Sequence, residues 1–479
     1  MVMIRGYFPG YFYKKESMQT YRQLSRKYDV SVPRYTSYPT VPSWKEGIDA
    51  EAWKTGFTRQ FLRGNKEDGI SLYIHLPFCE SLCIYCGCTK RITHNHSVEE
   101  EYIDAVLAEW RLYVDLMAEA PVIREIHLGG GTPTFFSPAN LARLVNGVLK
   151  NAVLHPGFEG SLEGHPNNTT REHLDVLYGL GFRRVSLGVQ DTNIEVQQLI
   201  HRIQPFENVR RVTDEARAAG FTSINFDLIY GLPGQDADRL VHTIRQSLSL
   251  SPDRLAFYSY AHIPGVSCNQ RLIDETQLPS AEEKLNLYVT GSACFLEAGY
   301  TDVGMDHFAL PSDELHHAWA TGALHRNFMG YTVQHSSLLL GLGMSAISDT
   351  GDAYAQNTKS LTDYYRSVTA GQPAVFKGYF LSEEDKVFRR HILDIACKGR
   401  TILSPEWAAT YETWTAPLLQ ELEADGLVFR QGTLVQLTER GRPFLRHVCK
   451  AFDLHLLRRE QAHGKTAGIC GKPAFASSL

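Results

Sequence analysis

The chain has 479 residues, of which 43% are apolar and 21% charged, and its formal net charge is −5. This composition is typical of a soluble globular protein with about three domains. The acidic balance argues against a nucleic-acid-binding protein, and no apolar run reaches the ~20 residues that a membrane helix needs.

The start of the chain and its cysteines indicate the compartment. Residues 1–16 carry a charge at Arg5 and a break at Pro9 and Gly10, so they lack the apolar core of a signal peptide. We therefore expect a cytoplasmic protein, in which nine cysteines do not indicate a disulfide framework. Four of them lie within ten residues and indicate a chemical site: Cys79, Cys83, Cys86 and Cys88.

The first 70 residues contain the turn-rich string 33–39 and then a helical pattern over residues 52–62. Beyond them, short apolar runs that favour strands alternate with helical patterns, one of which Ser137 should cap. Such alternation is typical of parallel βαβ units, and six units suit an open barrel better than a closed one of eight. The predicted strands are residues 71–76, 125–128, 160–163, 184–189, 223–229 and 254–260.

Beyond residue 352 the pattern changes to helices around a small hairpin. Helices are predicted over residues 384–395, 405–425 and 439–452, with the hairpin at 427–437. The predicted fold is thus α/β: a partial (β/α)6 barrel with an N-terminal extension and a mainly helical, winged-helix-like C-terminal domain. The expected division is an N-terminal segment 1–70, a catalytic domain 71–370, a C-terminal domain 371–460 and a disordered tail 461–479.

Polar or glycine-rich residues follow every predicted strand. Because the carboxyl ends of parallel strands meet at one edge of the sheet, these residues should surround one site. They are the four cysteines, residues 129–134, Glu163 with His165, Gln190 with Asp191, Asp227, and residues 260–262.

The spacing Cys-x3-Cys-x2-Cys brings three thiolates together. Iron–sulfur clusters are held by thiolates, and three protein ligands on four irons leave one iron open for another ligand. A zinc knuckle or reduced core thiols are the alternatives. For Gly129–Gly131, a tight turn is the alternative to close contact of the backbone with a ligand. A structural hydrogen bond or ion pair is likewise the alternative to ligand binding for Glu163, Asp227, Gln190 and Arg202.

These residues form a known signature. Residues 73–79 with Cys83, Tyr85, Cys86, Gly87 and Cys88 resemble the signature of the radical S-adenosylmethionine (SAM) superfamily, and within it the chain is similar to the oxygen-independent coproporphyrinogen III oxidases. The resemblance covers about residues 20–455. It includes the strings 33–39, 129–134, 188–191, 227–233, 260–262, 304–309, 324–328 and 343–348.

The resemblance implies a radical SAM oxidoreductase, a coproporphyrinogen dehydrogenase of heme and porphyrin biosynthesis. A reduced [4Fe–4S] cluster on Cys79, Cys83 and Cys86 would cleave SAM to a 5′-deoxyadenosyl radical. This radical would remove a hydrogen from a propionate, and loss of CO2 and an electron would leave a vinyl group. Two such events would convert coproporphyrinogen III to protoporphyrinogen IX. The implied partners are the porphyrinogen and an electron donor such as flavodoxin or ferredoxin, with no nucleic acid or membrane, and a monomer is expected.

The resemblance also assigns residues to SAM. One SAM, on the cluster, would contact Tyr73, Gly130, Glu163, Ala261 and Ile347, with Tyr73 and Glu163 catalytic. The resemblance leaves open whether a second SAM binds. Its site would contain Tyr85, Gly131, Thr132, Gln190, Arg202 and Asp227.

Three positions depart from the family pattern: His165, Thr89 and Met329. Met329 removes a polar group near the expected meeting point of SAM and substrate, so it bears on the second SAM. The alternatives are a radical SAM enzyme that opens or methylates heme, and a heme-binding chaperone, which Cys88 disfavours. A DNA-binding wing is disfavoured by Glu421, Glu423 and Asp425.

Two arginines are candidates for the carboxylates of the substrate. Arg34 and Arg326 lie in strings outside the shared superfamily core, where substrate identity should be encoded. Arginine suits carboxylates through paired hydrogen bonds. Surface or ion-paired arginines are the alternative. Residues 1–17 precede the resemblance, and we expect them to be an extension without a catalytic role, so that a chain beginning at Met18 keeps full activity.

Overall fold

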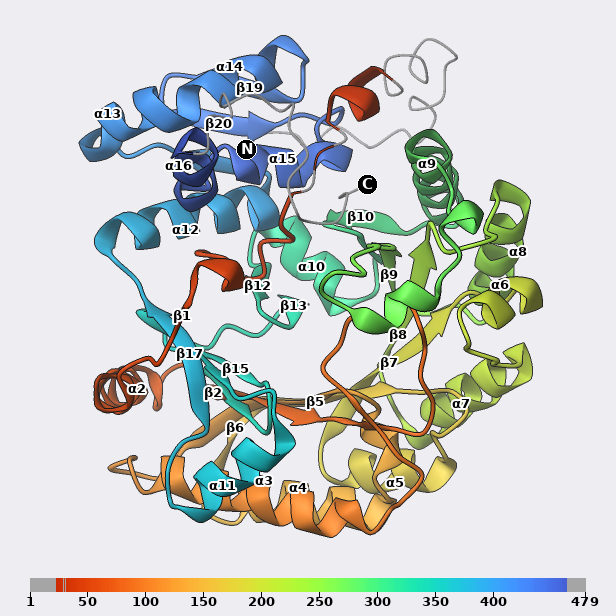
Figure 1. The fold of residues 1–479 in the computed structure, drawn as a ribbon, viewed down its shortest axis with the longest axis vertical. Helices are drawn as coiled ribbons and strands as arrows, with labels where there is room; N and C mark the ends of the chain where they lie inside the picture. Colours follow the sequence, from red (N-terminus) through yellow and green to blue (C-terminus); the bar gives the residue numbers. More distant parts are fainter. Residues whose placement is uncertain (1–22, 29, 31, 463–479) are drawn as a thin grey trace.

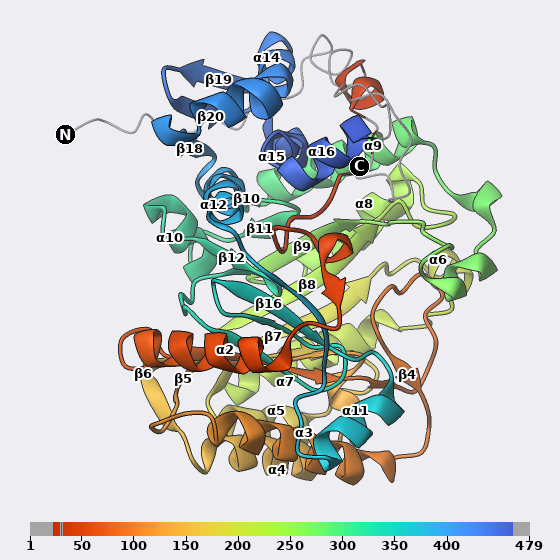
Figure 2. The same ribbon diagram turned by 60° about the vertical axis from the view of Figure 1, so that its left-hand side comes forward.

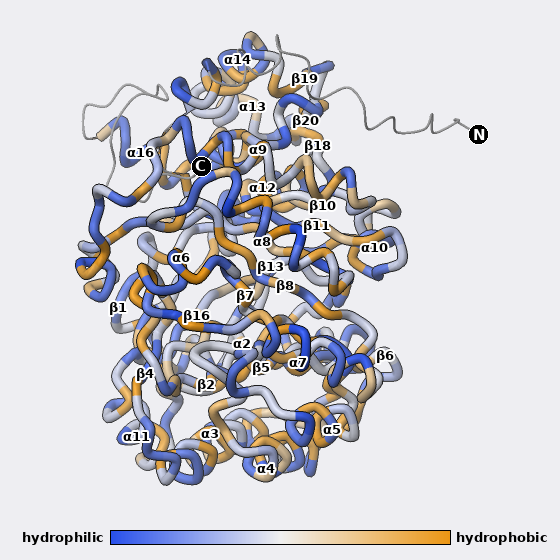
Figure 3. The backbone as a smooth tube through the Cα atoms, turned by 90° about the vertical axis from the view of Figure 1, so that its right-hand side faces the viewer, coloured by the Kyte–Doolittle hydropathy of each residue, from blue (hydrophilic) through white to orange (hydrophobic). Residues whose placement is uncertain are grey.

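The computed structural model describes residues 23–28, 30 and 32–462. Residues 1–17, the expected extension, lie outside the described residues, as does the expected disordered tail from residue 463 onward. Within the described part no helix is long and apolar enough to cross a membrane, and Figure 3 shows hydrophobic stretches alternating with hydrophilic ones along the chain.

All six predicted strands are present, and they are neighbours in one sheet (Figure 1). Each is parallel to the next, which confirms the expected partial barrel. Four of them begin one to seven residues earlier than predicted, and the last two begin at the predicted residue. The strands are β2 (Ile70–Leu76), β5 (Val122–Gly130), β6 (Val153–Gly164), β7 (Phe182–Gln190), β8 (Ser223–Tyr230) and β9 (Arg254–Ser259).

Helices cover the outer face of these strands (Figures 1 and 2). Along β8, Ile224 and Phe226 are fully buried, whereas Asn225 and Asp227 are half-buried on the other face, because successive side chains of a strand alternate. The helix after β5 begins at the predicted cap, Ser137. The covering helices are α3 (Val98–Val114), α4 (Pro138–Leu149), α5 (Arg171–Gly179), α7 (Phe206–Ala219) and α8 (Ala237–Leu248).

The sheet continues beyond the predicted strands at both edges. One further strand, β14, is parallel to β2, and the others are antiparallel. They were not predicted, because apolar runs of two to six residues carry too little periodicity to indicate a strand. They are β14 (Leu339–Leu342), β15 (Ile347–Asp349), β16 (Ala353–Asn357), β17 (Val375–Phe380) and β1 (Lys45–Glu46) at one edge, and β11 (His307–Ala309) and β10 (Thr301–Gly304) at the other.

The C-terminal part is helical around a three-stranded sheet, as expected. The predicted helix 405–425 is broken into short 3-10, π and α turns before α14. The predicted helix 439–452 shortens to α15, which follows a 3-10 turn over Arg442–Phe444 that contains Pro443, a residue without an amide hydrogen for an α-helical bond. The elements are α12 (Glu383–Lys398), β18 (Arg400–Ile402), α14 (Ala416–Ala424), β19 (Val428–Gln431), β20 (Leu434–Leu437), α15 (Leu445–Lys450) and α16 (Leu454–Ala462).

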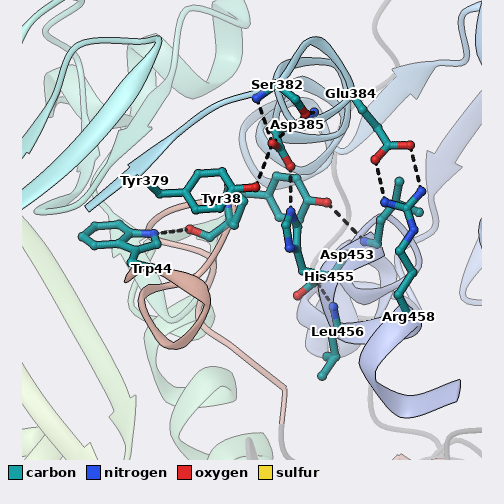
Figure 4. Close-up of polar contacts among 12 residues, drawn as sticks. Tyr38, Trp44, Tyr379, Ser382, Glu384, Asp385, Asp453, His455, Leu456 and Arg458 are labelled. Atoms are coloured by element: carbon teal, nitrogen blue, oxygen red, sulfur yellow. Dashed lines mark hydrogen bonds and ion pairs between the residues drawn. The ribbon is translucent and has the colours of Figure 1, made fainter. Parts of the chain in front are cut away.

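One hydrophobic core contains residues from both the first and the last described segments of the chain. It contains Tyr28 and Tyr38 from the start, Val303 from β10, and Phe388 and Phe452 from the C-terminal part. Polar contacts add to it where α12 meets α16 (Figure 4). The expected division at residues 70, 370 and 460 stays a prediction. The strands β1 and β17, which lie beyond the first two boundaries, belong to the main sheet.

Candidate active site

A cavity of about 440 Å³ opens at the carboxyl ends of the parallel strands. Every predicted strand of the barrel contributes to this end, either directly or through the loop that follows it. Of the predicted site residues, those that line the cavity are Arg34, Tyr85, Cys86, Gly130, Gly131, Thr132, Glu163, Gln190, Arg202, Asp227 and Ala261.

The cysteine loop crosses the mouth of the barrel between β2 and α3. Thr132 Oγ1 donates a hydrogen bond to Cys79 Sγ at 3.3 Å, and Arg202 Nη1 lies 3.5 Å from Cys83 Sγ. Both contacts come from elements that follow other strands, β5 and β7. The fold therefore brings hydrogen-bond donors to the sulfurs, which stabilises sulfur that carries negative charge.

Three thiols on this loop are the candidate cluster ligands. Among the described residues, no three His, Cys, Asp or Glu side chains converge on one point as a single metal ion requires. A four-iron cluster is larger, and its irons take thiolates at separate corners. Burial, together with the nearby Cys86 and Cys83, raises the pKa of Cys79 to about 11. The three thiols therefore lie close together, and this donor set fits a cluster.

Cys86 and Cys88 have different ionisation preferences. A hydrogen bond from Cys88, with help from Lys90, lowers the pKa of Cys86 to about 6. The same hydrogen bond raises the pKa of Cys88 well above its ordinary value. Within this pair, Cys86 is the favoured thiolate and Cys88 the thiol that donates to it.

The glycines after β5 allow the chain itself to pack closely. Gly130 has φ +118°, and a Cβ there would lie 2.6 Å from the ring of His75. A Cβ at Gly131 would lie 2.5 Å from the carbonyl oxygen of Pro77. The sequence left both a tight turn and a ligand contact open for these glycines, and the resemblance assigned Gly130 and Gly131 to SAM. The structure shows that the cysteine loop requires them, because it lies directly against this turn.

Glu163, at the end of β6, points into the cavity as a carboxylate. Its Oε2 accepts from the Gly130 amide at 3.0 Å, and its Oε1 lies 3.4 Å from His127 Nε2. Burial raises the pKa of Glu163, but His127 and the Gly130 amide together lower it by more, so the net shift of the pKa is downward. The side chain remains 43% exposed and can accept hydrogen bonds from a ligand.

Tyr73 lies behind Glu163 and does not line the cavity. Its ring stacks on His127 with centroids 5.9 Å apart. His75 Nε2 lies 3.0 Å from the Thr89 carbonyl oxygen and must donate to it, so Nδ1 accepts from the Tyr73 hydroxyl at 3.0 Å. Burial lowers the pKa of His75 to about 4, so the ring is neutral at neutral pH. Tyr73 is therefore placed to support Glu163 and the cysteine loop.

A second polar group lies across the cavity, on β7 and β8. Asp227 accepts from Ser186 Oγ at 3.0 Å and from Asn225 Nδ2 at 2.8 Å. Burial, and then the charge of Glu163, raise its pKa to about 7. Arg202 donates to the Gly188 carbonyl oxygen at 2.6 Å, while its Nε has no partner among the described residues. Gln190, with φ +64°, ends β7 beside it.

Tyr85 and Ala261 meet at the cysteine side of the cavity. The side chain of Gln270 donates to both of their carbonyl oxygens, at 2.8 Å and 3.1 Å. Ile347 is different: it is buried in β15 against Trp44 and does not line the cavity. The sequence-derived SAM site therefore includes two residues, Tyr73 and Ile347, that lie behind the cavity wall.

Arg34 and Arg326 lie next to each other but differ in accessibility. Arg34 is exposed in the cavity, lies 4.9 Å from the Tyr258 ring and donates to the Ser259 carbonyl oxygen at 3.1 Å. It forms no ion pair within the described part of the chain. Arg326 is 5% exposed, does not line the cavity, and donates to the Arg34 carbonyl oxygen at 3.2 Å. Arg34 is therefore the candidate for direct contact with the substrate, whereas Arg326 supports the backbone of Arg34.

The three departures from the family pattern lie at different depths. His165 lines the cavity, and burial, followed by the charge of Arg202, lowers its pKa well below the ordinary value. Thr89 contributes its backbone carbonyl to His75. Met329 is half-buried at the turn between β12 (His325–Asn327) and β13 (Gly330–Thr332), and it does not line the cavity.

Several residues of the site were missed in the sequence. His127, Ser186 and Asn225 each lie two residues before a residue at a strand end, on the same face of the strand. The period of two along a strand could have identified them. Gln270 lies in the short 3-10 helix Cys268–Leu272, which no local signal in the sequence indicates.

Comparison with known proteins identifies the family of the chain. The radical SAM superfamily matches residues 73–246. Oxygen-independent coproporphyrinogen III oxidase of Salmonella typhimurium is 39% identical over 442 residues, which are 91% of this chain and 95% of the relative; the Escherichia coli K12 enzyme matches equally. The solved structure of coproporphyrinogen III oxidase from Escherichia coli, described as a radical SAM enzyme, superposes with a TM-score of 0.83 and covers 88% of this chain and 97% of that one.

Proposed function

The chain belongs to the oxygen-independent coproporphyrinogen III oxidases of the radical SAM superfamily, and we propose on this premise what its site residues do. The enzyme converts two propionate side chains of coproporphyrinogen III to vinyl groups without dioxygen and so forms protoporphyrinogen IX. The observation that carries this function is that similarity spans nearly the full length of the oxidase relatives. The N-terminal string 33–39 places Arg34 in the same cavity.

The superfamily implies a [4Fe–4S] cluster and SAM, for which Cys79, Cys83 and Cys86 are the proposed ligands. When bound, the pair supplies a primary carbon radical that can abstract hydrogen from an unactivated carbon. The protein's contribution is to bind, orient and exclude water. Glu163, an ionised carboxylate held by two donors, is suited to an amine or to ribose hydroxyls. Tyr73 fixes His127 and His75 around it.

A second SAM remains a proposal. Its support is the separate polar group of Asp227, Gln190 and Arg202, which faces the cavity from the strands opposite Glu163. The free Nε of Arg202 is a donor suited to a carboxylate. Anaerobic equilibrium dialysis with labelled SAM tests this proposal. Two equivalents should bind the wild type and one should bind Asp227→Asn, whereas one equivalent in the wild type would contradict it.

The substrate carries ~4 ionised carboxylates near neutral pH. An acidic protein repels them, but the repulsion is weak beyond ~8 Å because salt screens it. Binding therefore depends on cations placed in the cavity, and Arg34 has the exposure and the free donors for this. An electron donor such as flavodoxin or ferredoxin, a cytoplasmic location and a monomeric state stay predictions.

The decisive experiment is anaerobic incubation of the reconstituted enzyme with coproporphyrinogen III, SAM and a reductant. Mass analysis should show the loss of CO2 and two hydrogens from each of two propionates. Parallel incubation with heme tests the alternatives, because a heme-acting enzyme would methylate or open the macrocycle and a chaperone would bind it unchanged. Turnover of heme with unchanged porphyrinogen would overturn the function.

A further inference from the structure

The segment after β9 crosses over the cysteine loop and holds its backbone. The side-chain amide of Asn269 donates to the carbonyl oxygens of Ile84 at 2.7 Å and Cys86 at 3.0 Å, and lies 3.4 Å from that of Cys83. Its Oδ1 accepts from Ser267 Oγ at 2.9 Å. One side chain, 183 residues from Cys86 in the sequence, thus contacts three carbonyl groups of the loop.

Gln270 completes this contact. Its Nε2 donates to the Tyr85 carbonyl oxygen at 2.8 Å and to that of Ala261 at 3.1 Å, while its Oε1 accepts from the Ile263 amide at 2.6 Å. Gln270 is only 2% exposed. Every carbonyl group from residue 83 to residue 86 therefore lies within reach of Asn269 or Gln270.

The loop has few backbone bonds of its own. Between residues 83 and 86 the hydrogen bond from the Cys86 amide to the Cys83 carbonyl oxygen closes one turn, and Ile84 donates to Ile200. Buried carbonyl groups need donors, and a loop that lacks them is free to take several conformations. The two amide side chains supply the donors that a helix or sheet would otherwise provide.

We propose that Asn269 and Gln270 are positioning residues for the metal site. They hold residues 83–86 in one conformation before metal binds, which keeps Cys83 and Cys86 on the same side of the loop. This inference rests on the proposed cluster ligands. The inference adds a role for the 3-10 helix Cys268–Leu272, which follows the sixth barrel strand. This helix determines how firmly the cluster is retained, although it does not contact iron.

Two nearly isosteric variants test the proposal: Asn269→Asp and Gln270→Glu. Each keeps an oxygen for its existing donor, Ser267 or the Ile263 amide, and replaces the donating nitrogen by an oxygen that faces carbonyl groups. Gln60→Ala is the matched control, because it removes an amide-to-carbonyl bond, to Ser337 at 3.2 Å, that lies outside the cavity.

Two readouts are measured. In the reconstituted protein, iron release to a chelator should be at least about tenfold faster in both variants, given the loss of two or more hydrogen bonds. In the metal-free protein, hydrogen–deuterium exchange of the amides of residues 83–87 should accelerate by a similar factor. Ser267→Ala removes the hydroxyl that contacts the Cys86 carbonyl oxygen and Asn269 Oδ1 but leaves both amide donors in place, so it should show a smaller change.

Wild-type rates of both processes in Asn269→Asp and Gln270→Glu would overturn the proposal, as would an equal effect of Gln60→Ala. Thermal unfolding of each variant identifies a general loss of stability. In that case protection of the amides from exchange would fall throughout the chain and not in residues 83–87 alone, and this result too would count against the proposal. If the wild type takes up no cluster, the proposed function fails, whereas the metal-free exchange experiment still decides this inference.

Discussion

Cys86 and Cys88 lie two positions apart, yet their surroundings favour opposite charge states. Cys86 accepts a hydrogen bond from the Cys88 thiol, and Lys90 adds positive charge nearby. A thiolate binds iron and a thiol does not. At the scale of single residues, the contrast between Cys86 and Cys88 thus has an electrostatic reason as well as a spacing reason, whereas the assignment of Cys79 and Cys83 as ligands rests on the spacing.

Alanine at Cys79, Cys83 or Cys86 should abolish the iron–sulfur absorbance near ~400 nm and the cleavage of SAM, because each removes one thiolate ligand. Cys88→Ala should retain the cluster. Absorbance spectra and iron content of the anaerobically reconstituted variants check this. Loss of the cluster in Cys88→Ala alone would show that the ligands are wrongly assigned.

Arg34→Ala should raise the KM for coproporphyrinogen by about 10- to 100-fold, the cost of one or more charge-assisted hydrogen bonds. Arg326→Ala should act in the same direction but less, because Arg326 reaches the cavity only through the Arg34 backbone. Steady-state kinetics measure both, with slow substrate-free SAM cleavage as the internal control. Normal porphyrinogen turnover in both variants would exclude them from substrate binding.

At the scale of elements, polar contacts between α12 and α16 hold α16 in place (Figure 4). Asp385, 2% exposed, accepts from His455 Nε2 at 2.7 Å, from Ser382 Oγ at 2.7 Å and from the Tyr379 hydroxyl at 3.2 Å. Burial raises its pKa, but His455 and Ser382 lower it more, so the net shift is downward.

Because the Asp385 pKa is lower in the folded than in the unfolded chain, ionised Asp385 stabilises the fold above the ordinary aspartate pKa, near ~4. This contribution is lost as the pH falls through the folded pKa. His455→Ala should cost about 1–3 kcal/mol at pH 7, since it leaves a buried acceptor without its donor. Thermal unfolding of wild type and Asp385→Asn should differ at pH 7 and converge toward pH 3. A constant difference would contradict the linkage.

At the scale of the whole molecule, the barrel and the C-terminal part are not independent. Their shared core includes Leu24 and Tyr35 from the start of the chain, Phe388 and Leu422 from the C-terminal helices, and Leu324 from beyond the sixth strand. The ion pair of Arg446 with Asp306 lies near Arg34 at the cavity. The described residues of the C-terminal part thus pack behind the Arg34 side of the cavity and do not line it.

A chain ending at residue 380 should therefore not fold as a stable barrel. Removing α12 and all later elements would expose the apolar side chains of the shared core, among them Tyr28 and Met305. Expression of this truncated chain, with measurement of solubility and binding of a hydrophobic dye, checks the prediction. A soluble, cooperatively unfolding truncated chain would support a separate catalytic domain ending near residue 370.

The sequence alone determined the six-stranded alternation, the cysteine loop and most of the cavity lining, because strand period and motif spacing are local properties. It could not reveal the role of Gly130 and Gly131 in packing against the cysteine loop. The sequence also could not predict that Arg34 is exposed in the cavity while Arg326 is buried. Nor could it predict the hydrogen bond from Asn269 to the carbonyl oxygen of Cys86, 183 residues away. These features were decided by the tertiary structure, because each depends on which atoms of distant segments meet, and no local pattern records that.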